Sequence, residues 1–113
     1  MTQLSSLSCN SQGEVSALSK KDAEQYLQQL DTDWEFNDTD QTISFDFKFK
    51  NYYETMAFVN AIAWVSHQQD HHPDLEVGYN HCLIRYSTHS VSGLSIKDFI
   101  CAAHVEQLTC LSD

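Results

Sequence analysis

The clearest pattern in the chain is an alternation of apolar and polar residues between positions 42 and 49. One side of this segment carries Ser44, Asp46 and Lys48, and the other side is apolar, with Ile43, Phe45, Phe47 and Phe49. A period of two residues is typical of a strand with one buried face. A shorter strand-like segment begins at Trp34, and the residues 37–40 between the two favour a turn. The pattern therefore predicts a β-hairpin.

Three other segments begin with a helix-capping sequence. In such a sequence a Ser or Asn side chain, and an acidic side chain three residues later, bond the first unpaired backbone amides of the helix. The capping pairs are Ser19 with Asp22, Asn51 with Glu54, and Ser95 with Asp98. We predict helices that run from these caps to about residues 31, 67 and 108.

The second of these helices is apolar over an unusually wide arc. Tyr53, Met56, Ala57 and Trp64 lie on one side of it, and Phe58, Ile62 and Val65 lie on another. A helix of this kind must be covered from two directions. The neighbouring helices could supply both covers, but we favour a second subunit on one side.

Two more strands are predicted at residues 75–79 and 81–87, joined through Gly78-Tyr79-Asn80. The element order is then α-β-β-α-β-β-α. This order predicts an α+β fold, with a four-stranded antiparallel sheet and three helices packed on one face. Residues 1–18 show no periodicity, so we expect a flexible tail there and one folded domain over residues 19–113.

The charge and cysteine content of the chain exclude some classes of function. The chain has 113 residues, with 16 acidic and 6 basic side chains and a net charge of −10. Proteins that bind nucleic acid or anionic membranes need basic side chains, so direct nucleic-acid binding and membrane binding are not expected. The four cysteines are widely separated and no secretory signal is visible. We expect reduced thiols and a cytoplasmic protein.

Histidines carry the strongest chemical signal. Five of the six, namely His67, His71, His72, His81 and His89, lie within a 23-residue span. They could be unrelated surface residues, or His67 and His71 could begin a metal site completed by His72, His81 or His89. They could also be a metal-free acid–base set, because imidazole exchanges protons near neutral pH. In that third case Asp70 and Asp98 could orient an imidazole, although either could be a local cap instead.

The spacing of these residues resembles that of a known family. The segment His67-Gln68-Gln69-Asp70-His71-His72-Pro73, followed by Tyr79, Thr88-His89 and Asp98, is similar to the signature of pterin-4a-carbinolamine dehydratases. Further matches are Trp34, the segment 47–52, Ala57-Phe58-Val59 and the segment 92–95. The resemblance covers about residues 19–108.

The resemblance implies an enzyme, a hydro-lyase that converts 4a-hydroxytetrahydropterin to quinonoid dihydropterin and water. This step belongs to tetrahydrobiopterin recycling after an aromatic amino acid hydroxylase has acted. The resemblance implies a homodimer or homotetramer, and no metal or organic cofactor. It carries the catalytic role over to His71, His72 and His89. The substrate would contact the two loops that hold His71, His72, Pro73, Thr88, His89, Ser90 and Val91.

The resemblance leaves the roles of the three histidines open. We assign His71 and His89 to the hydroxyl-bearing face of the pterin and His72 to the N5 proton. Two places depart from the family pattern: His67 stands where an acidic residue is frequent, and the loop Ser90-Val91-Ser92-Gly93 has serine where a second glycine is common. The alternative function is non-catalytic, because members of this family can also act as protein-interaction or dimerisation cofactors.

Overall fold

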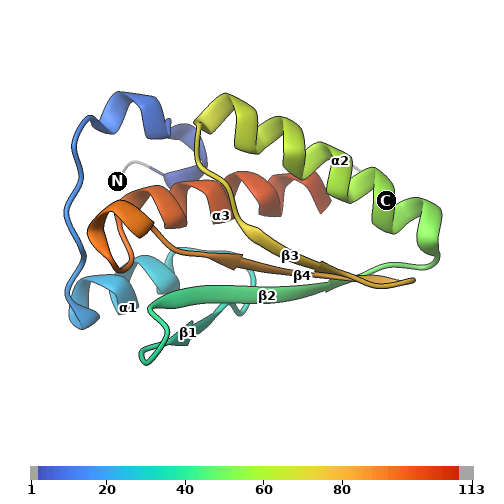
Figure 1. Ribbon diagram of the computed structural model, residues 1–113, viewed down its shortest axis with the longest axis horizontal. Coiled ribbons are helices and arrows are strands. Elements are labelled where there is room, and N and C mark those ends of the chain that lie inside the picture. Colours follow the sequence, from blue (N-terminus) through green and yellow to red (C-terminus); the bar gives the residue numbers. More distant parts are fainter. Residues whose placement is uncertain (1–2, 110–113) are drawn as a thin grey trace.

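The computed structural model describes residues 3–109 (Figure 1). Its strands and α-helices follow the predicted order and confirm the α+β fold. Three short 3₁₀ helices, η1 to η3, are present as well. In chain order the elements are η1 (Leu4–Ser6), η2 (Cys9–Gln12), α1 (Lys20–Gln28), β1 (Glu35–Asn37), β2 (Thr42–Lys48), α2 (Tyr52–Gln69), β3 (Asp74–Val77), β4 (His81–Tyr86), η3 (His89–Val91) and α3 (Ile96–Thr109).

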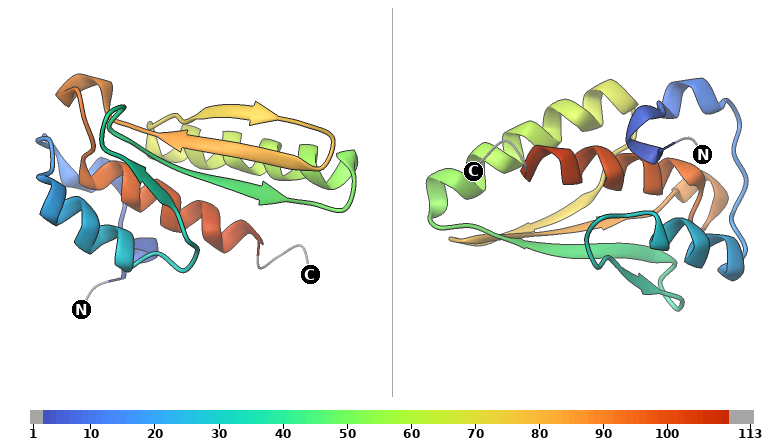
Figure 2. Two further views of the ribbon diagram at one scale, coloured as in Figure 1. Left: turned by 90° about the horizontal axis from the view of Figure 1, so that it is seen from below. Right: turned by 180° about the vertical axis from the view of Figure 1, so that it is seen from behind.

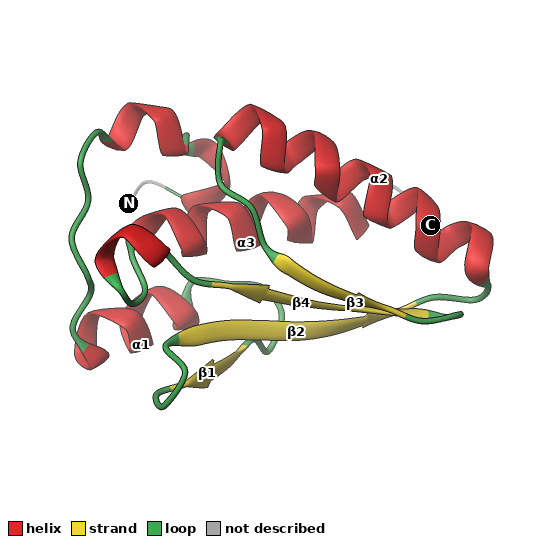
Figure 3. Cartoon of the chain, in the orientation of Figure 1, coloured by secondary structure: helices red, strands yellow, loops and turns green. Residues whose placement is uncertain are grey.

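The four strands form an antiparallel sheet in the order β1-β2-β4-β3. The alternation seen in β2 continues across the sheet, because its apolar residues pair with apolar residues of β4. The pairs are Ile43 with Tyr86, Phe45 with Ile84 and Phe47 with Cys82. Helices α2 and α3 lie side by side over this face, and α1 packs against α3 (Figures 2 and 3).

The predicted caps are present. The side chains of Ser19 and Asn51 accept hydrogen bonds from the backbone amides of Asp22 and Glu54, over 3.2 and 2.9 Å. Asp98 accepts from the amide of Ser95 over 2.9 Å. Each helix therefore begins where its local sequence satisfies the backbone donors that a helix start leaves unpaired.

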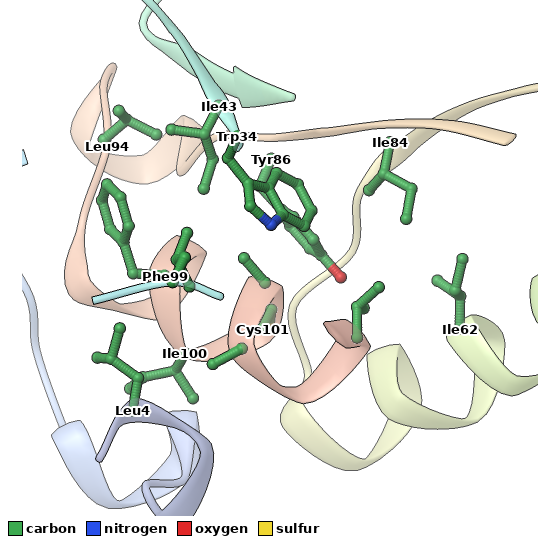
Figure 4. Close-up of a cluster of buried hydrophobic side chains, with 14 of the residues drawn as sticks. Leu4, Trp34, Ile43, Ile62, Ile84, Tyr86, Leu94, Phe99, Ile100 and Cys101 are labelled. Carbon is green, nitrogen blue, oxygen red and sulfur yellow. The ribbon is translucent and has the colours of Figure 1, made fainter. Parts of the chain in front are cut away.

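The core lies between the sheet and α3 (Figure 4). Trp34 is 4 % exposed and its ring lies 6.2 Å from that of Tyr86 and 5.9 Å from that of Phe47. Phe99 of α3 is fully buried and stacks on Tyr26 of α1. The aromatic residues of the two predicted hairpins thus join the helices in one cluster.

The N-terminal segment, where we expected a flexible tail over residues 1–18, contacts α3 over the part that the structure describes. Residues 3–18, which we call the N-terminal strap, pass over α3 and lead into α1 (Figure 1). Leu4 and Cys9 are 4 % and 1 % exposed, and Leu4 lies beside Ile100 in Figure 4. The buried side chains of the strap are few and irregularly spaced, so they leave no periodic pattern in the sequence.

Helix α2 is covered on one side only within the described part of the chain. Phe58, Ile62 and Val65 are buried, whereas Tyr53 and Trp64 are 84 % and 61 % exposed. The neighbouring helices therefore do not cover the whole apolar arc. No helix within residues 3–109 is both long and apolar enough to span a membrane.

Candidate functional site

The chain leaves α2 through a left-handed residue directly before the first catalytic candidate. The helix ends at Gln69, and Asp70 adopts φ 51° and ψ 42°. The amide of His71 then bonds the carbonyl of Ser66 over 3.2 Å. Because the helix has ended, the spacing of His67 and His71 no longer places them on one helical face. Among residues 3–109, no three His, Cys, Asp or Glu side chains are placed to bind a metal.

Asp98 joins this turn to the start of α3. Its Oδ1 lies 2.7 Å from Nε2 of His71, and its Oδ2 accepts from the hydroxyl of Thr88 over 2.7 Å and from the amide of Ser95. Asp98 is fully buried, and the His71 side chain is 11 % exposed. The two roles considered for Asp98 therefore coincide, because one carboxyl oxygen caps the helix and the other holds an imidazole.

The carboxylate also fixes which nitrogen of His71 carries a proton. A carboxylate only accepts, so Nε2 of His71 carries the proton that it shares with Asp98. Nδ1 is then the atom left to exchange a proton with another molecule. The ring is further oriented by Tyr86, whose ring lies parallel to it within 8° at a centroid distance of 6.0 Å.

Tyr86 is unusual in its own right. Its hydroxyl is buried and has no hydrogen-bond partner among residues 3–109. Burial raises its pKa well above the ordinary value, so the phenol stays neutral. The ring supplies a flat, uncharged wall behind His71.

The loop after β4 is closed on itself. The amide of Thr88 bonds the carbonyl of Gly93 over 2.8 Å, and the amide of Val91 bonds the carbonyl of Thr88 over 3.1 Å. The hydroxyl of Thr88 lies 2.8 Å from that of Ser95 as well as bonding Asp98. Thr88 thus closes the loop through its amide and joins the loop to the start of α3 through its hydroxyl.

An open groove of about 420 Å³ runs along this loop. Its walls come from the β1–β2 turn, the first residue of β3 and the loop after β4, which lie at one end of the sheet (Figures 1 and 2). The side-chain oxygen of Gln41 lies 3.5 Å from where a Cβ on Gly93 would be, so the turn and the loop pack closely. The lining residues are Thr39, Asp40, Gln41, Thr42, Asp74, Ser87, Thr88, His89, Ser92 and Gly93.

The structure brings some of the predicted site residues together and leaves others apart. His71, Thr88 and Asp98 form one hydrogen-bonded group, and His89 lines the groove next to Thr88. The groove lining includes neither His71 nor His72.

The remaining candidates lie in the same two loops. His72 and Ser90 are exposed, and Pro73 and Val91 are half-buried. Asp70 is exposed, and within residues 3–109 its side chain bonds no imidazole. Its observed role is to end α2.

Sequence reasoning missed the contribution of three places. Ser95 was expected only as a cap, and its hydroxyl also meets Thr88. Tyr86 belonged to an ordinary strand pattern, which gives no sign of stacking on a histidine. Residues 39–41 of the β1–β2 turn and Thr42 at the start of β2 gave no sign in the sequence that they would line a groove. None of these has a local signal, because each depends on which distant segment lies beside it.

Comparison with known proteins gives consistent results. The family model described as "Pterin 4 alpha carbinolamine dehydratase" matches residues 16–108. A relative from Nitrosomonas eutropha is 58 % identical over 97 residues, which is 86 % of this chain and 84 % of the relative. A relative from Legionella pneumophila strain Corby is 49 % identical over 108 residues, or 95 % and 96 % of the two chains. Both bear the name "putative pterin-4-alpha-carbinolamine dehydratase".

Two solved structures are similar in fold. A "transcriptional coactivator/pterin dehydratase" from Brucella melitensis superposes with a TM-score of 0.77 at 27 % identity, covering 81 % of this chain and 97 % of the other. A pterin dehydratase-like protein described as a RuBisCO assembly factor of the α-carboxysome gives 0.59 at 24 % identity, covering 66 % and 87 %. The second likeness concerns the fold alone.

Proposed function

The chain belongs to the pterin-4a-carbinolamine dehydratase family, and we propose that it removes water from 4a-hydroxytetrahydropterin to give quinonoid dihydropterin. In the cell this step would serve tetrahydrobiopterin recycling. The observation that carries the proposal is the buried His71–Asp98 pair, which is linked through Thr88 to the groove that His89 lines.

The groove supports binding of a flat polar ring. Its walls are rich in hydroxyl, amide and carboxylate groups from Thr39, Gln41, Thr42 and Asp74. A pterin carries hydrogen-bond donors and acceptors around its pyrimidine edge, and such edges are matched by a few convergent polar groups. We place the ring in this groove against the loop of residues 88–91, with its other edge towards Asp74, which directly follows the loop of residues 71–73.

The reaction needs two proton movements. The hydroxyl at C4a leaves as water when it receives a proton, and N5 loses a proton as the new double bond forms. A positioned imidazole gives roughly 10²- to 10⁴-fold in rate for such a transfer. His71, protonated and held through Nε2 by Asp98, would deliver the Nδ1 proton to the hydroxyl, with His89 on the same face. The exposed His72 would take the N5 proton.

Single substitutions test this assignment. His71→Ala, His72→Ala and His89→Ala are followed by stopped-flow measurement of carbinolamine loss, with substrate generated in situ. We expect kcat to fall by roughly 10²-fold or more in at least His71→Ala and His89→Ala. The matched control is His81→Ala, because His81 bonds Asp46 on the sheet and lies outside the groove. Full turnover in all three variants would refute the assignment.

A second candidate function is protein binding without catalysis, and the exposed face of α2 at Tyr53 and Trp64 favours it. The same stopped-flow assay separates the two. A chain that gives no acceleration over the uncatalysed loss of carbinolamine would support the binding function instead.

A further inference from the structure

Two cysteines outside the groove face each other in the core. Sγ of Cys9, in η2, lies 3.6 Å from Sγ of Cys101, in α3, although the two residues are 92 positions apart. They are 1 % and 0 % exposed. Because a disulfide bond is about 2.05 Å long, the sulfurs would have to approach by about 1.5 Å to form one. A shift of this size is within reach of side-chain rotation and a small movement of a short 3₁₀ helix.

Polar contacts on both sides of Cys9 hold the N-terminal strap in place. The amide of Cys9 bonds the side-chain oxygen of Gln69 over 2.7 Å, and the side-chain amide of Asn10 donates to the carbonyl of Gln68 over 3.0 Å. Nε2 of His104 donates to the carbonyl of Leu7 over 2.7 Å. These contacts join the strap to the end of α2 and to α3, so the two sulfurs are already opposed while reduced.

We propose that Cys9 and Cys101 are a redox-active pair that closes to an intramolecular disulfide, with a low-molecular-weight disulfide as the oxidant, and so fastens the strap to α3.

The two thiols differ in acidity, and this difference decides which of them attacks first in thiol–disulfide exchange. A hydrogen bond from the Cys101 thiol lowers the pKa of Cys9, and this outweighs burial, which raises it. The same hydrogen bond, together with burial, raises the pKa of Cys101 well above its ordinary value. Cys9 is therefore the nucleophile, since the thiolate is the attacking form, and Cys101 is the resolving thiol.

The exchange takes place in two balanced steps. The Cys9 thiolate attacks one sulfur of the oxidant RSSR, which breaks the S–S bond and releases RS⁻ to take up a proton as RSH. Cys101 gives up its proton and attacks the Cys9 sulfur of the mixed disulfide, which expels the second RSH. The two protein thiols are oxidised, and one small disulfide is reduced to two thiols. The buried sulfurs become accessible when the strap opens locally.

This site does not follow from the family fold. The family model begins at residue 16, so Cys9 lies outside it. The proposal is also independent of the proposed dehydratase activity. Another buried thiol, Cys82 of β4, serves as an internal comparison, because burial raises its pKa to about 11.

Trypsin makes the test direct. Its cleavage after Lys and Arg places Cys9 in the peptide 1–20, Cys82 in 51–85, and Cys101 together with Cys110 in 98–113. The full chain and its Cys110→Ser variant are reduced, desalted and incubated with glutathione disulfide. Remaining thiols are then alkylated under denaturing conditions. We expect a cross-link between the peptides 1–20 and 98–113 that persists in Cys110→Ser, with Cys82 alkylated.

Thermal unfolding supplies the second measurement. Closing so long a loop constrains the unfolded chain, and we expect the oxidised protein to melt roughly 5–15 °C above the reduced protein. Cys9→Ser and Cys101→Ala should each lose the shift, whereas Cys82→Ser should keep it. A cross-link that disappears in Cys110→Ser, glutathione mixed disulfides alone, or an oxidised protein that melts no higher than the reduced one would overturn the proposal. The comparison of oxidised and reduced wild-type chain holds even where a variant fails to fold.

Discussion

At the scale of single residues, the site depends on one carboxylate that serves two elements. Asp98 caps α3 through one carboxyl oxygen, which also accepts from the hydroxyl of Thr88. Its second oxygen is then available to the His71 ring, which arrives from the end of α2. A group with both of its oxygens engaged has little freedom to rotate, so it fixes the tautomer and the direction of the imidazole. We therefore treat Asp98 as a positioning residue.

Substitution of this carboxylate tests the positioning role. Asp98→Asn can still cap the helix, but it can present an amide NH₂ to His71, which favours the wrong tautomer. We expect kcat for dehydration to fall by roughly 10²-fold, with an altered pH profile and a smaller change in KM. Asp70→Asn is the matched control, because Asp70 is exposed and precedes His71 directly. An unchanged pH profile in Asp98→Asn would contradict the positioning role.

Substitution of Tyr86 is expected to stabilise the protein. Its buried hydroxyl has no partner within residues 3–109, and such a group costs roughly 1–3 kcal/mol of stability. Tyr86→Phe removes the hydroxyl and keeps the ring that stacks on His71. We expect the free energy of unfolding in urea to rise by about 1 kcal/mol. A loss of stability instead would mean that the hydroxyl is hydrogen-bonded, for example to a buried water.

At the scale of elements, the sheet carries a polar group in which one contact lies within β2 and another crosses to β4. On β2, Asp46 bonds Lys48 over 2.8 Å and His81 of β4 over 3.0 Å. Partial burial raises the pKa of Asp46, but the hydrogen bonds from Lys48 and His81 outweigh it, and the net pKa is lowered. Gly78 belongs to the same arrangement, because the His81 ring occupies the space that a Cβ on Gly78 would need.

The lowered pKa of Asp46 predicts a pH-dependent contribution to stability. The folded state holds the carboxylate more firmly than the unfolded chain, whose Asp pKa is about 3.9. The contribution is therefore present above that value and is lost as pH falls through the lower folded pKa. Solvent screening limits it to about 1 kcal/mol. Asp46→Asn should lower the free energy of unfolding at pH 7, and the difference should shrink towards pH 3.

Urea titrations at the two pH values measure this difference. Asp33→Asn, at an exposed position before β1, is the control, and it should not change with pH in this way. A deficit of equal size at pH 3 and pH 7 would show that the carboxylate charge is not responsible.

A buried glutamate joins α3 to the segment that enters β1. Glu106 is 5 % exposed and accepts hydrogen bonds from the amides of Asp31 and Thr32 and from the indole nitrogen of Trp34. The hydroxyl of Thr32 also donates to this carboxylate. The three N–H groups can only donate, so an amide NH₂ placed against one of them would oppose a donor with a donor. Glu106→Gln should therefore cost about 2–3 kcal/mol in the free energy of unfolding. Glu24→Gln, at an exposed position of α1, is the matched control and should be near neutral.

At the scale of the whole molecule, the outer side of α2 exposes apolar side chains that no other described element covers. An apolar groove of about 360 Å³ runs beside it, lined by Phe49, Tyr53, Glu54, Ala57, Phe58, Ala61 and Leu108. Exposed apolar surface of this kind is uncommon on monomers. It fits the homo-oligomer that the width of the apolar arc predicts, in which a second copy of the chain covers Tyr53 and Trp64.

Self-association is tested by light scattering coupled to size-exclusion chromatography. We expect a dimer or tetramer for the unmodified chain, and a shift towards monomer for Trp64→Glu, because a charge buried in an interface without a partner is costly. Gln25→Glu adds the same charge at an exposed position of α1 and should leave the assembly intact. A monomeric unmodified chain would refute the oligomer.

The local sequence determined much of this protein. The caps at Ser19, Asn51 and Ser95 and the alternation in β2 placed the elements, because hydrogen bonding at helix ends and side-chain direction in strands depend on near neighbours. The histidine spacing likewise indicated the family. Only the tertiary structure decided the rest. It brought Asp98 into hydrogen-bond contact with His71, which is 27 positions away, and stacked Tyr86 on the same imidazole ring. It also placed the β1–β2 turn and His89 on the walls of one groove, and it buried Cys9 against Cys101. Contacts between distant segments depend on how whole elements pack, and no periodicity along the chain records that packing.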